Sequence, residues 1–187
     1  MSPTTTLSFS LWIKGGGSIV GVCGSTDNSG KSIAVVRWGD SDFRLYIGSA
    51  NYAYASSPDV TDGTSWWHVV WTYDGGGAGD SDKVKCYVNG SASSLTFSGT
   101  IPTSLPDPTC RFALGRALSG SGIGQMNGLL DQVAFWSRAI SSTEASEIYN
   151  AGSGLAYSSW DAVTGTLILS HLGGIQGRSA LTGGIRG

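Results

Sequence analysis

Charged residues are scarce in this chain of 187 residues, at 13% of the composition, which is about half the usual share of a soluble protein. A formal net charge of -2 at pH 7 gives no broad cationic surface for nucleic acid or for an acidic membrane. No apolar run approaches the ~20 residues that span a bilayer, and the start of the chain has no charged segment followed by an apolar core, as a secretion signal would. We therefore expect no nucleic-acid partner, no membrane partner and no export through a signal peptide.

Groups for catalysis are also sparse. The two glutamates, Glu144 and Glu147, lie in one short segment, and no predicted strand carries two acidic residues on the same face. A glycoside hydrolase needs two carboxylates about 5 to 10 Å apart. His68 and His171 are far apart in the sequence, and no Gly-x-Ser-x-Gly nucleophile motif is present. We expect no catalytic residues, and hence a protein that is not an enzyme.

Cysteine is the third scarce type. Cys23, Cys86 and Cys110 can form at most one disulfide, so at least one thiol stays free. Their spacing matches no zinc finger or zinc ribbon. We interpret them as buried thiols.

Glycine and tryptophan are abundant by contrast, with 29 and 7 copies. Turn formers mixed with aromatic and β-branched residues predict an all-β chain of many short strands. Residues 7–13 alternate apolar and other side chains, the period-two pattern of a half-buried strand, whereas 66–74 (WWHVVWTYD) is apolar on both parities and predicts a central strand. Further strands are expected at 18–23, 32–38, 43–48, 51–55, 83–88, 91–97, 110–115, 128–138 and 166–172.

Local signals define the connections. Asn89-Gly90 predicts a tight hairpin, with Val84, Cys86 and Val88 facing inward and Lys83, Lys85 and Tyr87 facing outward. The acidic stretch with Asp74, Asp80 and Asp82 does not have the ordered ligand spacing of an EF-hand, and we expect a solvated hairpin loop there.

Only one helix is predicted, near 141–151. Ser141 and Glu144 form a capping box, in which hydroxyl and carboxylate each accept from an exposed amide, and Gly152 is placed to end the helix. About ten strands exceed what one open sheet holds comfortably, so we expect a two-sheet sandwich or jelly roll. We assign 1–160 to this domain and 161–187 to a C-terminal strand followed by a glycine-rich arm.

The ordered series LSFSLWIK, WWHVVWTYD, VKCYVNG, FALGR and MNGLLDQVAFWSRAISSTEASEIYN resembles the laminin G-like, concanavalin A-like lectin jelly-roll superfamily over roughly residues 7–152. The resemblance implies a two-sheet antiparallel jelly-roll sandwich and a binding or structural role. Family members usually carry one further strand before this series, which often contributes to a calcium site. Here we expect 166–172 to occupy that edge.

Asp131 is the carboxylate within the most diagnostic segment, GLLDQVAFWSR. We interpret it, with Ser141 and Glu144, as a structural residue that accepts backbone or hydroxyl hydrogen bonds beside the capped helix. The alternative is a calcium ligand at Asp131. Apart from calcium, no cofactor is expected.

Aromatic residues near loop ends are candidates for binding carbohydrate, because flat rings stack on sugars at small entropic cost. We single out Trp38, Tyr46, Tyr52 and Tyr54. The tryptophans within strands are expected to fill the core, namely Trp12, Trp67, Trp71 and Trp136.

The C-terminal segment repeats GGIQG as GGIRG ten residues later, which predicts either a flexible tail or an arm that orders on a neighbouring copy. Its candidate contacts are Ile175, Arg178, Ile185 and Arg186. An adhesive module with no export signal and such an arm fits a bacteriophage virion surface protein, as a capsid decoration (cement) or tail-associated component. The partners would then be a capsid or other virion protein and further copies of the chain, with the virion as its location. The alternative is a lectin-like domain of a secreted or surface protein that binds extracellular glycans.

Overall fold

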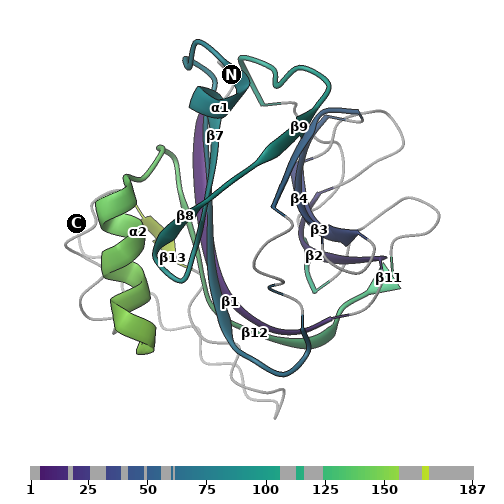
Figure 1. Cartoon of the computed structure of the whole chain (residues 1–187), viewed down its shortest axis with the longest axis vertical. Coiled ribbons are helices and arrows are strands. Elements are labelled where there is room, and N and C mark those ends of the chain that lie inside the picture. The colour runs from purple at the N-terminus through teal and green to yellow at the C-terminus, as the bar shows by residue number, and fades with distance from the viewer. Residues whose placement is uncertain are drawn as a thin grey trace, which may run out of the picture.

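The computed structural model describes residues 5–16, 19–25, 33–38, 42–48, 50–55, 60, 62–105, 113–115, 124–155 and 166–168. In this part of the chain two sheets pack face to face, with the helix Ser142–Tyr149 (α2) on the outside (Figure 1). The expected all-β jelly-roll sandwich is therefore confirmed. Its strands are Thr6–Gly16 (β1), Ile19–Ser25 (β2), Ile33–Trp38 (β3), Asp42–Ile47 (β4), Tyr52–Ala55 (β5), Trp67–Asp74 (β6), Val84–Val88 (β7), Ser91–Ser93 (β8), Thr96–Ser98 (β9), Ala113–Leu114 (β10), Gly124–Gln125 (β11), Asn127–Trp136 (β12) and Thr166–Ile168 (β13).

The six-stranded sheet has the order β13-β12-β1-β6-β7-β8, and the seven-stranded sheet has the order β10-β2-β3-β4-β5-β9 with β11 beside β2. Neighbouring strands are antiparallel except for β11 and β2. The late strand β13 pairs with β12 at the sheet edge, as expected from the sequence. The Asn89-Gly90 hairpin is also confirmed, because both residues have positive φ and join β7 to β8.

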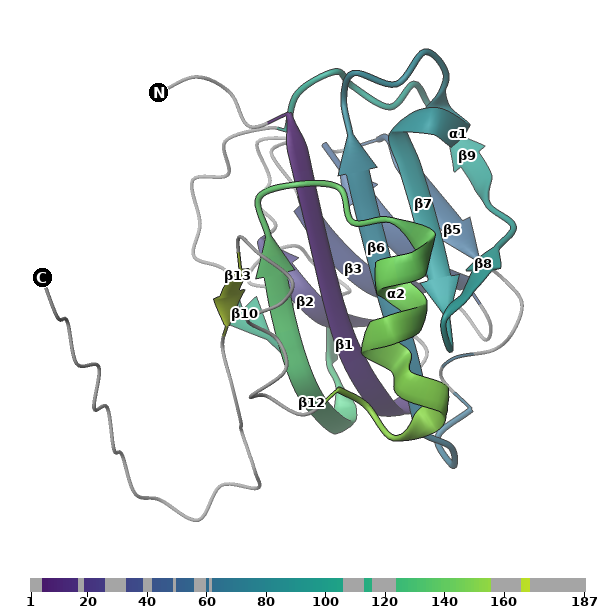
Figure 2. The same ribbon diagram turned by 90° about the vertical axis from the view of Figure 1, so that its left-hand side faces the viewer.

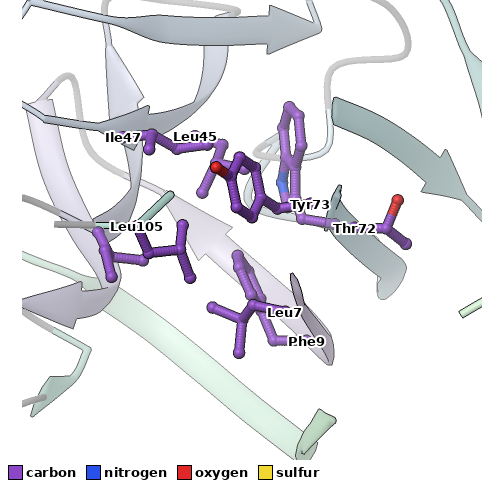
Figure 3. Close-up of a pocket in the computed structure, with 9 residues that line it drawn as sticks. Leu7, Phe9, Leu45, Ile47, Thr72, Tyr73 and Leu105 are labelled. Carbon is purple, nitrogen blue, oxygen red and sulfur yellow. The ribbon is translucent and has the colours of Figure 1, made fainter. Parts of the chain in front are cut away.

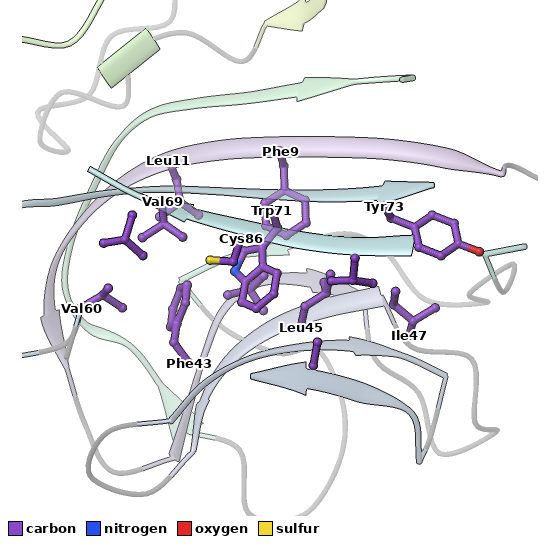
Figure 4. Close-up of a cluster of buried hydrophobic side chains, with 14 of the residues drawn as sticks. Phe9, Leu11, Phe43, Leu45, Ile47, Val60, Val69, Trp71, Tyr73 and Cys86 are labelled. Atoms are coloured by element: carbon purple, nitrogen blue, oxygen red, sulfur yellow. The ribbon is translucent and has the colours of Figure 1, made fainter. Parts of the chain in front are cut away.

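The core fills the space between the sheets (Figure 4). Alternate residues of β1 point into it, and they meet alternate residues of β4 from the opposite sheet because strand side chains have a period of two. Trp71 is fully buried near its centre, with its ring 6.3 Å from that of Phe43. Cys86 is a free, buried thiol whose pKa is raised by burial. The side chain of Cys23 and the whole of Cys110 lie outside the described residues.

The predicted helix is confirmed as Ser142–Tyr149 (α2), followed by a 3-10 turn at Asn150–Gly152. Ser141 Oγ accepts from the amide of Glu144, and the Glu144 carboxylate accepts from the amide of Ser141 at 2.7 Å. Arg138 forms an ion pair with Glu144. Hydrogen bonds from Arg138, together with those from Ser141, lower the pKa of Glu144 to about 2.

Helix α2 covers the outer face of the six-stranded sheet (Figure 2). A second apolar cluster lies there, which includes Trp136, Tyr87, Ala145 and Ile148. Trp136 is therefore buried, as predicted, but in the apolar cluster beneath α2 and not between the two sheets. Tyr87 faces outward as predicted, away from Val84, Cys86 and Val88, but it is only 5% exposed because this second cluster covers it.

The outward hydroxyls of β1 hold the connection between β12 and α2. Ser8 Oγ donates to the carbonyl of Arg138 at 2.7 Å and accepts from the amide of Ile140 at 3.0 Å. Two residues earlier on the same face of β1, Thr6 Oγ1 donates to the carbonyl of Ser137. Ser8 is fully buried, and its hydroxyl satisfies one buried backbone amide and one partly buried backbone carbonyl.

The next outward residues of β1 meet a buried histidine. Ser10 Oγ lies 2.8 Å from His68 Nε2, and the rings of Trp12 and Tyr149 lie 5.2 and 5.9 Å from the imidazole. The His68 side chain is fully buried, and its Nδ1 has no hydrogen-bond partner among the described residues. Because burial penalises the imidazolium ion, the pKa of His68 is lowered to about 4.

The acidic stretch differs from the sequence expectation. Asp80–Lys83 form a short second helix (α1). The sequence predicted a solvated hairpin loop here and only one helix, near 141–151. Lys83 is also buried, contrary to the outward prediction, and its Nζ donates to the carbonyl of Ile101 at 2.7 Å. Asp80 accepts from the amide of Ile101 at 3.0 Å. Hydrogen bonds from α1 therefore connect Ile101 to the chain just before the start of β7. Local sequence patterns do not predict such a long-range contact.

Replacing Ser8 with Ala should destabilise the protein by about 1 to 3 kcal/mol, because the buried amide of Ile140 and the partly buried carbonyl of Arg138 lose their partner. The matched control is Thr6→Ala, whose hydrogen bond is exposed and whose loss should change stability by about 0.5 kcal/mol or less. Urea unfolding of the three proteins at pH 7 measures the difference. Equal effects of the two substitutions would contradict the role assigned to Ser8.

His68 should make the protein less stable in mild acid. In the unfolded chain its pKa returns to about 6.5, so between about 6.5 and 4 the unfolded state binds a proton that the folded state does not. The free energy of unfolding is therefore complete above pH 6.5 and should fall by up to about 3 kcal/mol as the pH drops to 4. In His68→Gln, which keeps a polar partner for Ser10, urea unfolding between pH 7 and 5 should show a flatter profile. If the free energies of unfolding of variant and wild type depend on pH in the same way, this prediction is wrong.

Candidate functional site

The outer face of the seven-stranded sheet carries a cluster of polar and aromatic side chains on β4 and β5. Both strands alternate strictly between half-buried and buried residues. The buried set points into the core, and the other set points outward because successive strand side chains alternate. We call the outward set the tyrosine face: Asp42, Arg44, Tyr46, Tyr52 and Tyr54.

Cross-strand register brings the three tyrosines together. Tyr46 pairs with Tyr52, and Arg44 pairs with Tyr54. The ring centroids of Tyr46 and Tyr52 are 5.1 Å apart, and those of Tyr52 and Tyr54 are 6.2 Å apart. These distances are in the range of favourable aromatic contacts, so the rings form one continuous surface.

Arg44 fixes this surface. Its Nη2 donates to Asp42 Oδ2 at 2.9 Å and its Nη1 donates to Tyr46 Oη at 3.3 Å. The guanidinium carbon lies 4.7 Å from the ring centre of Tyr52 and 5.6 Å from that of Tyr54, close enough for cation–π attraction. The guanidinium therefore links all three rings to one carboxylate.

Three of the four carbohydrate-binding candidates thus lie together on the tyrosine face. The backbone of the fourth, Trp38, pairs with Asp42 at the end of the neighbouring strand β3, and its side chain is outside the described part. Sequence reasoning missed Asp42 and Arg44. The signal was available, because the alternation in DFRLYI places both on the same parity as Tyr46.

Asp131 lies elsewhere, on β12 of the six-stranded sheet, and is exposed. Its Oδ1 accepts from the amide of Gln132 at 2.8 Å. Gln132 has a φ of 45° and lies at a shift in register between Ser10 and Trp12 of β1, which is the geometry of a β-bulge. Among the residues that the structure describes, no group of three or more His, Cys, Asp or Glu side chains gathers as a metal site would.

Two hollows lie away from the tyrosine face. One is a cavity of about 10 Å³ within the core, lined by residues such as Leu7, Leu45 and Leu105 (Figure 3). That volume is near the lower limit for a single water molecule. The other, of about 210 Å³, lies between β7 and the segment from β8 to β9, where Leu95 and Phe97 line it.

The arm residues Ile175, Arg178, Ile185 and Arg186 lie outside the described residues. In the described part, no helix is both long enough and apolar enough to cross a bilayer.

Comparison with known proteins supplies the wider context. A protein from Bacteroides ovatus with a proposed carbohydrate-binding role superposes with a TM-score of 0.60 at 18% identity, over 78% of this chain and 41% of its own. A heptameric pentraxin from Limulus polyphemus gives a TM-score of 0.60 at 16% identity, over 79% and 71%. Botulinum neurotoxin type C, whose cell entry depends on two ganglioside molecules, gives 0.57 at 14% identity, over 81% and 36%.

At such low sequence identities these superpositions show a shared fold and nothing further. This chain spans less than half the length of the Bacteroides protein. No match was found among curated proteins. The laminin G-like family model, described as the concanavalin A-like lectin/glucanases superfamily, matches residues 1–146. The chain therefore belongs to the laminin G-like family of the concanavalin A-like lectin/glucanase superfamily.

Proposed function

We propose that this protein is a non-enzymatic carbohydrate-binding module and that the tyrosine face is its binding surface. The observation that carries the proposal is the grouping of three tyrosines on one sheet face, where the ring of Tyr52 lies 5.1 Å from that of Tyr46 and 6.2 Å from that of Tyr54. The proposed role of the Bacteroides neighbour and the description of the superfamily support it.

The geometry suits a sugar ring. The apolar C–H face of a pyranose stacks on an aromatic ring, while its hydroxyls need donors and acceptors at the rim. The tyrosine hydroxyls and the Asp42 carboxylate supply such groups. Thr96 and Ser98 of β9 pair with Tyr54 and Tyr52, which adds two hydroxyl-bearing positions along the same rows.

The rings also need little ordering before a ligand arrives. Arg44 is held by Asp42 and Tyr46 and lies against Tyr52 and Tyr54, so the side chains are fixed in the free protein. A fixed surface avoids part of the entropy cost of binding, which is about 0.5 to 1.5 kcal/mol for each side chain that must be immobilised.

The carboxylates described on this face support the proposal of a non-catalytic role. Hydrolysis of a glycosidic bond requires two carboxyl groups on either side of it. Within the described residues of the tyrosine face, Asp42 is the one carboxylate, and it is paired with Arg44. Both glutamates lie on α2, on the outer face of the other sheet.

The first interpretation of the sequence was a bacteriophage virion surface protein. The descriptions of the neighbouring structures support the alternative, carbohydrate binding, in preference to it. Attachment to a capsid or tail protein, self-association through the C-terminal arm, virion or extracellular location, and calcium binding at Asp131 all stay predictions.

Replacing Tyr52, the central ring, with Ala should weaken glycan binding by about two- to tenfold, because loss of a stacking ring costs about 0.5 to 1.5 kcal/mol. Tyr52→Phe, which keeps the ring, should retain most of the affinity. A glycan array would identify ligands of the wild type, and calorimetry with the best ligand would compare the variants.

The control is Trp66→Ala. Trp66 is an exposed aromatic residue, at 40%, that directly precedes β6 of the other sheet. Its removal should leave glycan binding unchanged. Loss of binding in Trp66→Ala with full binding in Tyr52→Ala would move the site to the other sheet, and an array without any ligand would refute the proposed function.

A further inference from the structure

The cross-strand rows of the tyrosine face continue onto strand β9. Tyr46 pairs with Tyr52, which pairs in turn with Ser98. In the next row, Tyr54 pairs with Thr96. Side chains that pair across neighbouring strands lie on the same face of a sheet. The hydroxyls of Thr96 and Ser98 are therefore on the same side of the sheet as the tyrosines, one strand spacing, about 4.8 Å, beyond β5.

Strand β9 is held in place by the residue between these two hydroxyls. Phe97 pairs with Ala53 and packs against the core between the sheets. Just after the strand, Asn51 Oδ1 accepts from the amide of Thr100 at 3.3 Å. Both contacts attach β9 to β5 and to the sandwich, so the hydroxyls of β9 have defined positions relative to the tyrosine rings.

In the opposite direction, toward β3, the same rows are buried. Ala34 pairs with Tyr46, and Val36 pairs with Arg44, so both lie on the outer face of the sheet. Their exposed fractions are nevertheless 2% and 0%, whereas Thr96 at the other end of the rows is exposed. A ligand that stacks on the tyrosines can therefore extend over β9 and cannot extend over β3.

The two ends of these rows offer different chemistry. The tyrosine rings suit the apolar C–H face of a pyranose. A serine or threonine hydroxyl instead provides one donor and two acceptor positions, which match the hydroxyl groups of a sugar. We propose that Thr96 and Ser98 form a second subsite, which binds the hydroxyls of the sugar that follows the one stacked on the tyrosines. The unit recognised is then a disaccharide whose long axis crosses the strands from β4 toward β9. This inference rests on the proposed function and adds the size and the direction of the ligand.

The experiment compares two probes. One is the disaccharide that the wild type binds most tightly on a glycan array, and the other is the methyl glycoside of each of its two sugars. Calorimetry gives the affinity for the disaccharide, and titration followed by NMR gives the weaker affinities for the monosaccharides. Thermal melting shows that each protein is folded.

Four proteins are compared. The test variant is Thr96→Val with Ser98→Ala, which removes both hydroxyls and keeps β9 of similar bulk. The conservative variant is Thr96→Ser with Ser98→Thr, which exchanges the two residues and keeps both hydroxyls. The control is Ser91→Ala, which removes an exposed hydroxyl from β8 of the other sheet. The fourth protein is the wild type.

The wild type should bind the disaccharide about tenfold more tightly than either monosaccharide, which is the effect of about two hydrogen bonds. The test variant should lose about tenfold in affinity for the disaccharide, while its affinity for the better monosaccharide should change by less than about threefold. The conservative variant should keep most of the affinity for the disaccharide. Ser91→Ala should bind both probes as the wild type does.

Failure of the inference can be told apart from failure of the proposed function. A wild type that binds the disaccharide no more tightly than the monosaccharides overturns the inference alone. The same holds for a test variant that keeps full affinity for the disaccharide, or that loses affinity for both probes equally. A wild type that binds no glycan, or a Tyr52→Ala variant that binds both probes as well as the wild type, refutes the proposed function and the inference together.

Discussion

The fold depends on the two faces of β1. One parity of this strand, Phe9, Leu11 and Ile13, is buried between the sheets. The other parity, Ser8 and Ser10, is equally buried, beneath the layer that leads from β12 into α2. Buried hydroxyls are stable only when they are paired, and here they pair with the backbone around Ile140 and with His68. The same strand thus holds the second sheet on one side and the helical layer on the other.

This arrangement leaves the two outer faces with different roles. The outer face of the six-stranded sheet is covered by α2, so its aromatic residues Trp12 and Trp136 serve packing. The outer face of β4 and β5 keeps its aromatic rings half-exposed, and contacts with Arg44 hold them in place. The packed core behind this face supports the strands that carry the rings, as the proposed binding of glycans requires.

Membership of the superfamily establishes the fold, whereas function belongs to the side chains on its surface. The structural neighbours include a protein with a proposed carbohydrate-binding role, a pentraxin and a neurotoxin, all at 14 to 18% identity. Such distant relatives share the sandwich and can differ in every surface residue. The argument for glycan binding therefore rests on the tyrosines.

The sequence by itself determined the elements with a local cause. Period-two alternation predicts the strands, Asn89-Gly90 predicts the hairpin, and the Ser141–Glu144 pair predicts the helix, because each signal acts over a few residues. The positions of Tyr46, Tyr52 and Tyr54 near loop ends also made them candidates for carbohydrate binding. Tertiary structure alone decided that these rings share one surface with Arg44, since strand register brings β4 and β5 together. It also decided that Tyr87 is buried, because alternation assigns a side chain to a face but does not say what covers that face. Lys83 is buried because it lies in α1 and donates to the distant carbonyl of Ile101.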